Sequence, residues 1–132
     1  MTATTLTRAL FALAAVYDGA LGAVFLFAPT WPFRLHGVAE PNHPAYVQFP
    51  AALLLIFALM FLTVARDPAR FRHLIPFGVL LKAAYCGLAF GYWFTSGIPG
   101  MWKTFAVADL AFGLLFVWAF FAVRPATAAG PR

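Results

Sequence analysis

Three ionisable residues interrupt otherwise apolar stretches of this sequence: Asp18, Lys82 and Asp109. Asp18 lies in VYDGALGAVFLFA (16–28), and Asp109 lies in VADLAFGLLFVWA (107–119), a stretch that matches the first at Val, Asp, Ala, Gly, Phe and Ala. Charged groups in such surroundings can pair with one another, carry a proton, or bind a cation or a polar headgroup. Two neighbouring carboxylates in a low dielectric disfavour double ionisation, so we expect one proton to be shared or retained there.

Tyrosines accompany these charges along the sequence. Tyr17 precedes Asp18, Tyr85 follows Lys82 by one helical turn, and Tyr92 lies further along the same segment. Their hydroxyls could hydrogen-bond a carboxylate, so the candidate ligand- or proton-binding site comprises Asp18, Lys82, Asp109, Tyr17, Tyr85 and Tyr92. The alternative is that the charges pair only to fix the helix register, which polar pairs in membranes also do. Cys86, beside Tyr85, is expected only to pack.

Other chemistry has weaker support. His36, Glu40 and His43 form a weak candidate for a metal site, but Pro41 breaks their helical spacing, so we predict solvated loop residues and no metal. No P-loop, G-x-S-x-G, H-E-x-x-H or dinucleotide-binding fingerprint occurs in the sequence. No catalytic residue is therefore assigned and a non-catalytic role is favoured. No cofactor is expected, although a bound quinone or lipid is left open.

The composition indicates a membrane protein. Of the 132 residues, 64% are apolar, 18% are aromatic and only 10% are charged, whereas about a quarter of a soluble domain is charged. The net charge of +5 comes from basic residues that flank apolar segments and form no continuous stripe. This distribution sets membrane topology, so we expect the lipid bilayer as a partner and no nucleic acid.

Four apolar segments are long enough to cross a bilayer core of about 30 Å as helices. They cover approximately 6–28, 46–65, 74–95 and 102–123, and are separated by the proline- or glycine-containing stretches APTWP, RDPAR and SGIPG. Their long apolar runs show no alternation of apolar and polar residues, which excludes a β-barrel. We therefore predict an all-α polytopic membrane protein, with residues 1–132 forming a single four-helix transmembrane domain.

The distribution of basic residues predicts the orientation. With four spans, one side holds Arg8, Arg66, Arg70, Arg72, Arg124 and Arg132, and the other holds Arg34 and Lys103. The positive-inside rule then places both termini in the cytoplasm. The expected location is a bacterial cytoplasmic membrane, as the resemblance given below implies. From that side, helical rise places Asp18 at roughly 18 Å, Asp109 at roughly 21 Å and Lys82 at roughly 12 Å. The carboxylates are thus nearly level, and Lys82 could reach up to them or extend down to the headgroups.

The first outer loop is predicted to contain a short helix lying on the membrane surface. Thr30 could cap it, Pro32 suits its first turn and Gly37 suits its exit. Small residues at helical spacing from the charges predict close helix contacts. They are Ala14, Ala15 and Gly22 near Asp18, Gly113 near Asp109, and the stripe Ala83, Gly87 and Gly91 near Lys82.

Several of these stretches resemble small four-helix bacterial membrane proteins that are DoxX-like or uncharacterised. The resemblance rests on YDGALGAVFLFAP, GVAEPNHPAYVQ, VARDPAR, GVLLKAAYCG and ADLAFGLLF, and most distinctively on Asp18, ARDP (65–68), Lys82 and Asp109. It implies an accessory role near quinones in a membrane redox system, with no cofactor ligated by this chain and no catalytic residue transferred.

Three classes of function therefore stand. The favoured one is a non-catalytic accessory or scaffold subunit of a membrane complex, either a homo-oligomer or a hetero-oligomer with other membrane proteins. The second is an oligomeric proton- or ion-coupled transporter or channel that uses the Asp–Lys–Asp cluster. The third is a membrane enzyme that binds a lipid or a quinone and uses the carboxylates as acid and base.

Overall fold

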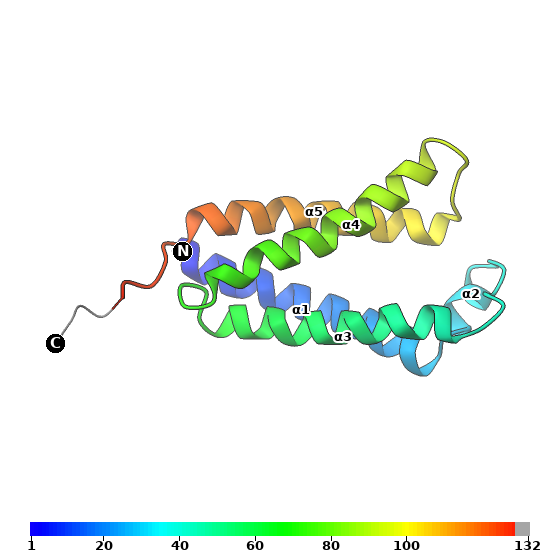
Figure 1. The fold of residues 1–132 in the computed structure, drawn as a ribbon, viewed down its shortest axis with the longest axis horizontal. Coiled ribbons are helices and arrows are strands. Elements are labelled where there is room, and N and C mark those ends of the chain that lie inside the picture. Colours follow the sequence, from blue (N-terminus) through cyan, green and yellow to red (C-terminus); the bar gives the residue numbers. More distant parts are fainter. Residues whose placement is uncertain (129–132) are drawn as a thin grey trace.

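Four long helices form two antiparallel hairpins in this computed structural model, which describes residues 1–128. The long helices are α1 (Ala3–Phe27), α3 (Ala45–Arg66), α4 (Ile75–Trp93) and α5 (Gly100–Ala122). The first hairpin pairs α1 with α3, the second pairs α4 with α5, and contacts within each pair outnumber those between the pairs. The predicted all-α four-helix bundle is confirmed, and the described residues contain no strand. Figure 1 shows the hairpins side by side.

All four long helices are suited to a hydrocarbon surrounding. The three-residue 3₁₀ turn η1 (Arg72–Leu74) leads directly into α4, so the four segments are 25, 22, 22 and 23 residues long. In each segment, between 22% and 33% of a highly apolar stretch of 18 residues is buried inside the bundle. The remaining apolar surface faces outward, as expected where lipid replaces water as the solvent. The helices thus fit an integral membrane protein.

The N-terminus of the chain and the end of α5 lie at one end of the bundle, here called the terminal end (Figure 1). The opposite end carries the short helix α2 and is called the α2 end. Which end faces the cytoplasm stays a prediction from the basic residues. Arg132, which the sequence analysis counted on the cytoplasmic side, lies outside the described residues.

The helix expected in the first loop is α2 (Trp31–Leu35), with Pro32 in its first turn. Thr30 occupies the N-cap position of this helix as predicted, but its side chain makes no capping hydrogen bond. Its backbone is already helical (φ −95°, ψ −19°), whereas a capping side chain needs an extended backbone to reach back to the first free N–H groups. Gly37 takes the chain out of the turn at φ +62°, a region that favours glycine.

Two apolar cores hold the bundle together, one in each half. At the terminal end, Phe11, Phe61 and Phe116 are all 0% exposed, and the ring centroids of Phe11 and Phe116 lie 4.4 Å apart in a stacked arrangement. At the α2 end, the buried core is smaller and comprises Phe25, Phe33, Ala51 and Met101. The first core joins both hairpins, because it includes residues of α1, α3, α4 and α5.

Helices α1 and α3 make their close approach at Gly22. A Cβ atom at this position would lie 2.8 Å from the carbonyl oxygen of Ala51 on α3. That distance is too short for a side chain of any kind, so the absent side chain allows the two backbones to pack. The predicted contact of α1 through small residues is thereby confirmed, with Ala14, Ala15 and Gly22 all buried.

Candidate functional site

Lys82 joins the two hairpins through a buried ion cluster. Its Nζ atom lies 2.8 Å from Oδ1 and 3.0 Å from Oδ2 of Asp18, and 2.8 Å from Oδ1 of Asp109. The side chains of Lys82 and Asp18 are each 1% exposed, and that of Asp109 is 12% exposed. Lys82 therefore extends to the carboxylates, which decides between the two directions that its sequence position left open.

Three helices hold the members of this cluster in place. Asp18 comes from α1, Lys82 from α4 and Asp109 from α5. Gly113, one turn from Asp109, makes room for the lysine, since a Cβ there would lie 3.2 Å from Lys82 Cβ. The Lys82 ammonium also lies 5.4 Å from the ring centroid of Phe112 and 5.6 Å from that of Tyr17. These aromatic faces add a favourable interaction with the cation.

The predicted tyrosines differ in their relation to the cluster. Tyr17 lies beside it, but its buried hydroxyl has no hydrogen-bond partner among the described residues. Tyr85 lies close by, and its hydroxyl donates a hydrogen bond of 2.9 Å to the carbonyl oxygen of Trp102 and none to a carboxylate. Tyr92 is 57% exposed near the α2 end of α4 and takes no part in the cluster. None of the three donates a hydrogen bond to Asp18 or Asp109 in the described chain.

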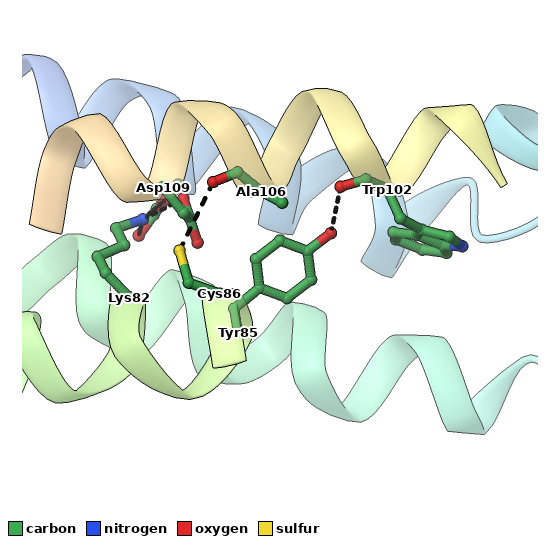
Figure 2. A network of polar contacts seen from close by, with 7 residues as sticks. Lys82, Tyr85, Cys86, Trp102, Ala106 and Asp109 are labelled. Carbon is green, nitrogen blue, oxygen red and sulfur yellow. Dashed lines mark hydrogen bonds and ion pairs between the residues drawn. The ribbon is translucent and has the colours of Figure 1, made fainter. Parts of the chain in front are cut away.

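Polar contacts from one face of α4 continue along α5 (Figure 2). The Cys86 thiol donates to the carbonyl oxygen of Ala106 at 3.5 Å, next to the Lys82–Asp109 pair. The Tyr85 hydroxyl reaches Trp102 one turn closer to the α2 end. Cys86 was expected only to pack, and this weak contact adds to its packing. The second hairpin is thus held together along the α2-end side of the cluster by contacts of its own.

A cavity of about 520 Å³ lies between the two hairpins, on the α2-end side of the ion cluster. Asp18 and Asp109 form its polar floor, and all other lining side chains except two tyrosines and a tryptophan are purely apolar. Each long helix contributes to the walls, for example through Phe25, Leu54 and Phe105. The site is therefore an apolar chamber with ionisable groups at one end.

The cavity reaches the outer surface between α3 and α4. Leu53 on α3 and Leu88 on α4 line it and are 38% and 67% exposed. Tyr46, at the start of α3, lines it near the α2 end and is also exposed. These helices meet near the terminal end, where Gly78 lies against Phe61, and they diverge toward the α2 end (Figure 1). The opening thus faces the region that lipid would occupy.

The apolar walls of this cavity were not predicted from the sequence. A signal was present, because Leu21 and Phe25 follow Asp18 by three and seven residues, and Phe105 and Trp102 precede Asp109 by four and seven. Residues at these spacings share a helix face. Counting along the face from each buried charge would have identified them, although it would not have shown that the space between them is open.

The loop residues of the weak metal candidate are not brought together. Glu40 pairs with Arg34 at 2.6 Å, His36 Nδ1 lies 2.8 Å from the carbonyl oxygen of Pro32, and His43 Nδ1 accepts from the backbone of Ala45. Among the described residues, no group of three His, Cys, Asp or Glu side chains could hold a metal ion.

Comparison with known proteins returns no match: no family model, no curated protein and no solved structure is similar to this chain. The resemblance to DoxX-like proteins therefore stays a prediction from the sequence. The features that bear on function are the ion cluster, the cavity on its α2-end side and the apolar outer surface.

Proposed function

We propose that this protein is a non-catalytic integral membrane protein that binds an apolar molecule taken from the bilayer. The observation that supports this proposal is the cavity of about 520 Å³ with Asp18 and Asp109 at its floor. Ligand pockets of roughly 300–1,000 Å³ with apolar walls and a few placed polar groups are typical of small-molecule sites. Lipids and quinones are among the molecules of this general kind.

The position of the opening favours access from the lipid phase. Leu53 and Leu88 are exposed on the outer surface and also line the cavity, so a ligand dissolved in the bilayer can enter between α3 and α4 without crossing water. Its apolar body would contact the walls, and its polar end would reach the carboxylates. Burial of the polar end next to ionised groups orients the ligand, because a polar group without a partner is costly there.

The packing of the terminal half favours binding over a channel. Phe11, Phe61 and Phe116 are 0% exposed and fill the space between the cluster and the terminal end. A channel needs a water-lined route through both halves, and these aromatic side chains occupy the route on one side. An ion- or proton-coupled transporter would need this core to open in a second conformation.

The test is to fill the cavity and measure ligand retention. We expect the wild-type protein, extracted gently from its own membrane, to carry a stoichiometric apolar molecule in native mass spectrometry. Leu54→Trp places a larger side chain in the cavity wall and should remove this molecule. Leu114→Trp is the matched control, because Leu114 is 64% exposed on α5 and does not line the cavity. Equal occupancy in the two variants, or an empty wild-type cavity, would contradict the proposal.

A second candidate function, an accessory subunit of a membrane complex, has support from a different surface. The stripe Ala83, Gly87 and Gly91 on α4 is exposed, and a Cβ added at Gly87 or Gly91 would meet nothing within 4 Å. In membranes, small-residue stripes allow another helix to pack closely. An accessory role near quinones, as the DoxX-like resemblance implies, would use this surface together with the cavity.

The accessory role is tested by enlarging the stripe. Gly87→Leu should release a partner chain or dissociate a homo-oligomer, as seen by native mass spectrometry after mild extraction. Ala12→Leu on the exposed face of α1 is the control. A protein that is monomeric in both forms would refute the accessory role and leave the ligand-binding proposal untouched.

A further inference from the structure

The ion cluster at the cavity floor has one carboxylate more than its ammonium can neutralise. A lysine ammonium has three hydrogens, and Lys82 directs two contacts to Asp18 and one to Asp109. With all three groups ionised, two negative charges face one positive charge. The described parts of the four long helices bring no other ionised Lys, Arg, Asp or Glu side chain to the cavity.

The carboxylate that Lys82 contacts through one oxygen alone lies on the cavity side of the cluster. Both oxygens of Asp18 contact the ammonium, and this side chain is 1% exposed. Asp109 uses only Oδ1, is 8% exposed as a residue, and lines the cavity. Its Oδ2 atom accepts no hydrogen bond from the described residues. The second oxygen of this nearly buried side chain is therefore free for a ligand.

The walls above this oxygen are rich in aromatic rings. Phe25, Tyr46, Tyr85, Trp102 and Phe105 line the cavity and come from all four long helices. The faces of aromatic rings attract cations, and they bind organic ammonium groups in many recognition sites. The same walls supply too few oxygen atoms for a small metal ion such as Ca²⁺, which takes about six to eight oxygen ligands.

We propose that the cavity binds a lipophilic organic cation with a single positive charge, such as an ammonium or phosphonium group within an apolar body. This inference rests on the proposed function and specifies its ligand class. The cation neutralises the excess carboxylate, its apolar groups contact the aromatic and aliphatic walls, and the filled site is electrically neutral. Ligands with an anionic head are repelled by the same charge.

A proton competes with the cation for Asp109, because either one neutralises the same excess charge. The titratable or charged groups near Asp109 are Asp18 and Tyr17 on α1 and Lys82, Tyr85 and Cys86 on α4, while α3 contributes Tyr46 to the cavity lining. At a pH where Asp109 is protonated in the empty site, cation binding therefore releases that proton. The affinity for the cation falls as the pH is lowered.

The experiment measures binding of radiolabelled tetraphenylphosphonium to the full chain in nanodiscs, with empty nanodiscs as background. Uncharged triphenylphosphine oxide and anionic tetraphenylborate lack the positive charge. We expect each to compete at least about tenfold more weakly than unlabelled tetraphenylphosphonium, a difference of about 1.4 kcal/mol in binding free energy. Binding should weaken in acidic buffer. Asp109→Asn should lower the affinity by about tenfold or more and remove most of the pH dependence. Asp67 lies in the loop before η1 and does not line the cavity, so Asp67→Asn should change neither the affinity for the cation nor its pH dependence.

The outcomes separate this inference from the proposed function. Competition by the uncharged compound that equals or exceeds that of the cation would overturn the cation preference and leave an apolar-ligand site. Binding of none of the three probes would overturn the cation inference, and with an empty cavity in the native protein it would end the proposed function as well. The competition and pH measurements use the wild-type chain, so they decide the matter even where Asp109→Asn fails to fold.

Discussion

Replacing Lys82 with methionine tests whether the ion cluster stabilises the association of the two hairpins. The substitution keeps the length and apolar stem of the side chain and removes an ammonium with three carboxylate contacts of 2.8, 3.0 and 2.8 Å. Asp18 and Asp109 then face each other in a buried site without a counter-ion. The N-terminal hairpin would lose its ionic connection to the second hairpin.

The loss of stability depends on the two buried carboxylates that Lys82→Met leaves without a counter-ion. Polar pairs in membranes contribute about 0.6 kcal/mol on average, but removing one partner of a buried ion pair costs about 3–5 kcal/mol, because a charge stays buried without compensation. Proton uptake by the carboxylates limits this loss. We therefore expect Lys82→Met to lower the free energy of unfolding by about 3 kcal/mol at neutral pH, and by less in acidic buffer, where proton uptake is easier.

The assay is reversible unfolding in mixed micelles by titration with a denaturing detergent, followed by tryptophan fluorescence. Lys103→Met is the matched control, because Lys103 is half-buried near the surface, where its ammonium lies 5.0 Å from the ring centroid of Trp93. It should lose less than about 1 kcal/mol. The triple variant Asp18→Leu, Lys82→Met and Asp109→Leu should regain most of the stability, since no charge is left unpaired. The reasoning would be refuted if Lys82→Met were as stable as the wild type, or if the triple variant were as unstable as Lys82→Met.

Three further substitutions test contacts between helices. Gly22→Ala should destabilise the protein by about 2 kcal/mol, because the added methyl group would lie 2.8 Å from the carbonyl oxygen of Ala51. In the same unfolding assay, Gly87→Ala should be neutral or stabilising, since its methyl group meets nothing within 4 Å, and a loss as large as that of Gly22→Ala would contradict the assigned contact. Tyr85→Phe removes the hydrogen bond to Trp102 and should cost about 0.6 kcal/mol. A cost of several kcal/mol would assign Tyr85 a larger part in the cluster than its contacts indicate.

The fold could be predicted because a membrane allows few solutions. Apolar runs of about 20 residues form helices in lipid, since every backbone polar group must be satisfied within the segment. The prolines and glycines between the runs end the helices close to where they were expected. The short helix α2 was also recognisable, although the role of Thr30 was not, because a cap depends on backbone angles that the residue type alone does not determine.

The ion cluster could be predicted for a related reason. An isolated charge in hydrocarbon is costly, so Asp18 and Asp109, at nearly the same depth, were expected near one another. Lys82 was a candidate partner whose direction the sequence left open. The tyrosine hydrogen bonds could not be predicted in the same way. Tyr85 had a backbone carbonyl within reach as an alternative acceptor, and Tyr92 lies on a face of α4 that turns outward. Such choices depend on side-chain direction and on the tilt between the hairpins.

The cavity was beyond sequence reasoning because it results from an angle between helices. Helices α3 and α4 lie close together where Phe61 fills the space left by Gly78, and they separate toward the α2 end (Figure 1). The position of Gly78 was not singled out in the sequence, yet a Cβ there would lie 2.9 Å from the Phe61 ring. A single small residue at the terminal half thus contributes to a wide opening in the other half.

The division of the charges between the hairpins has a consequence for how the chain assembles during synthesis. The second hairpin contains Lys82 and Asp109 and can form a neutral pair within itself. The first hairpin, which leaves the ribosome earlier, contains Asp18 and no lysine of its own near that depth. It must wait in the membrane with an unpaired acidic group until α4 is inserted. Lys82 therefore supplies the first hairpin, as well as the second, with a partner for its carboxylate, and a chain interrupted before α4 leaves Asp18 without one.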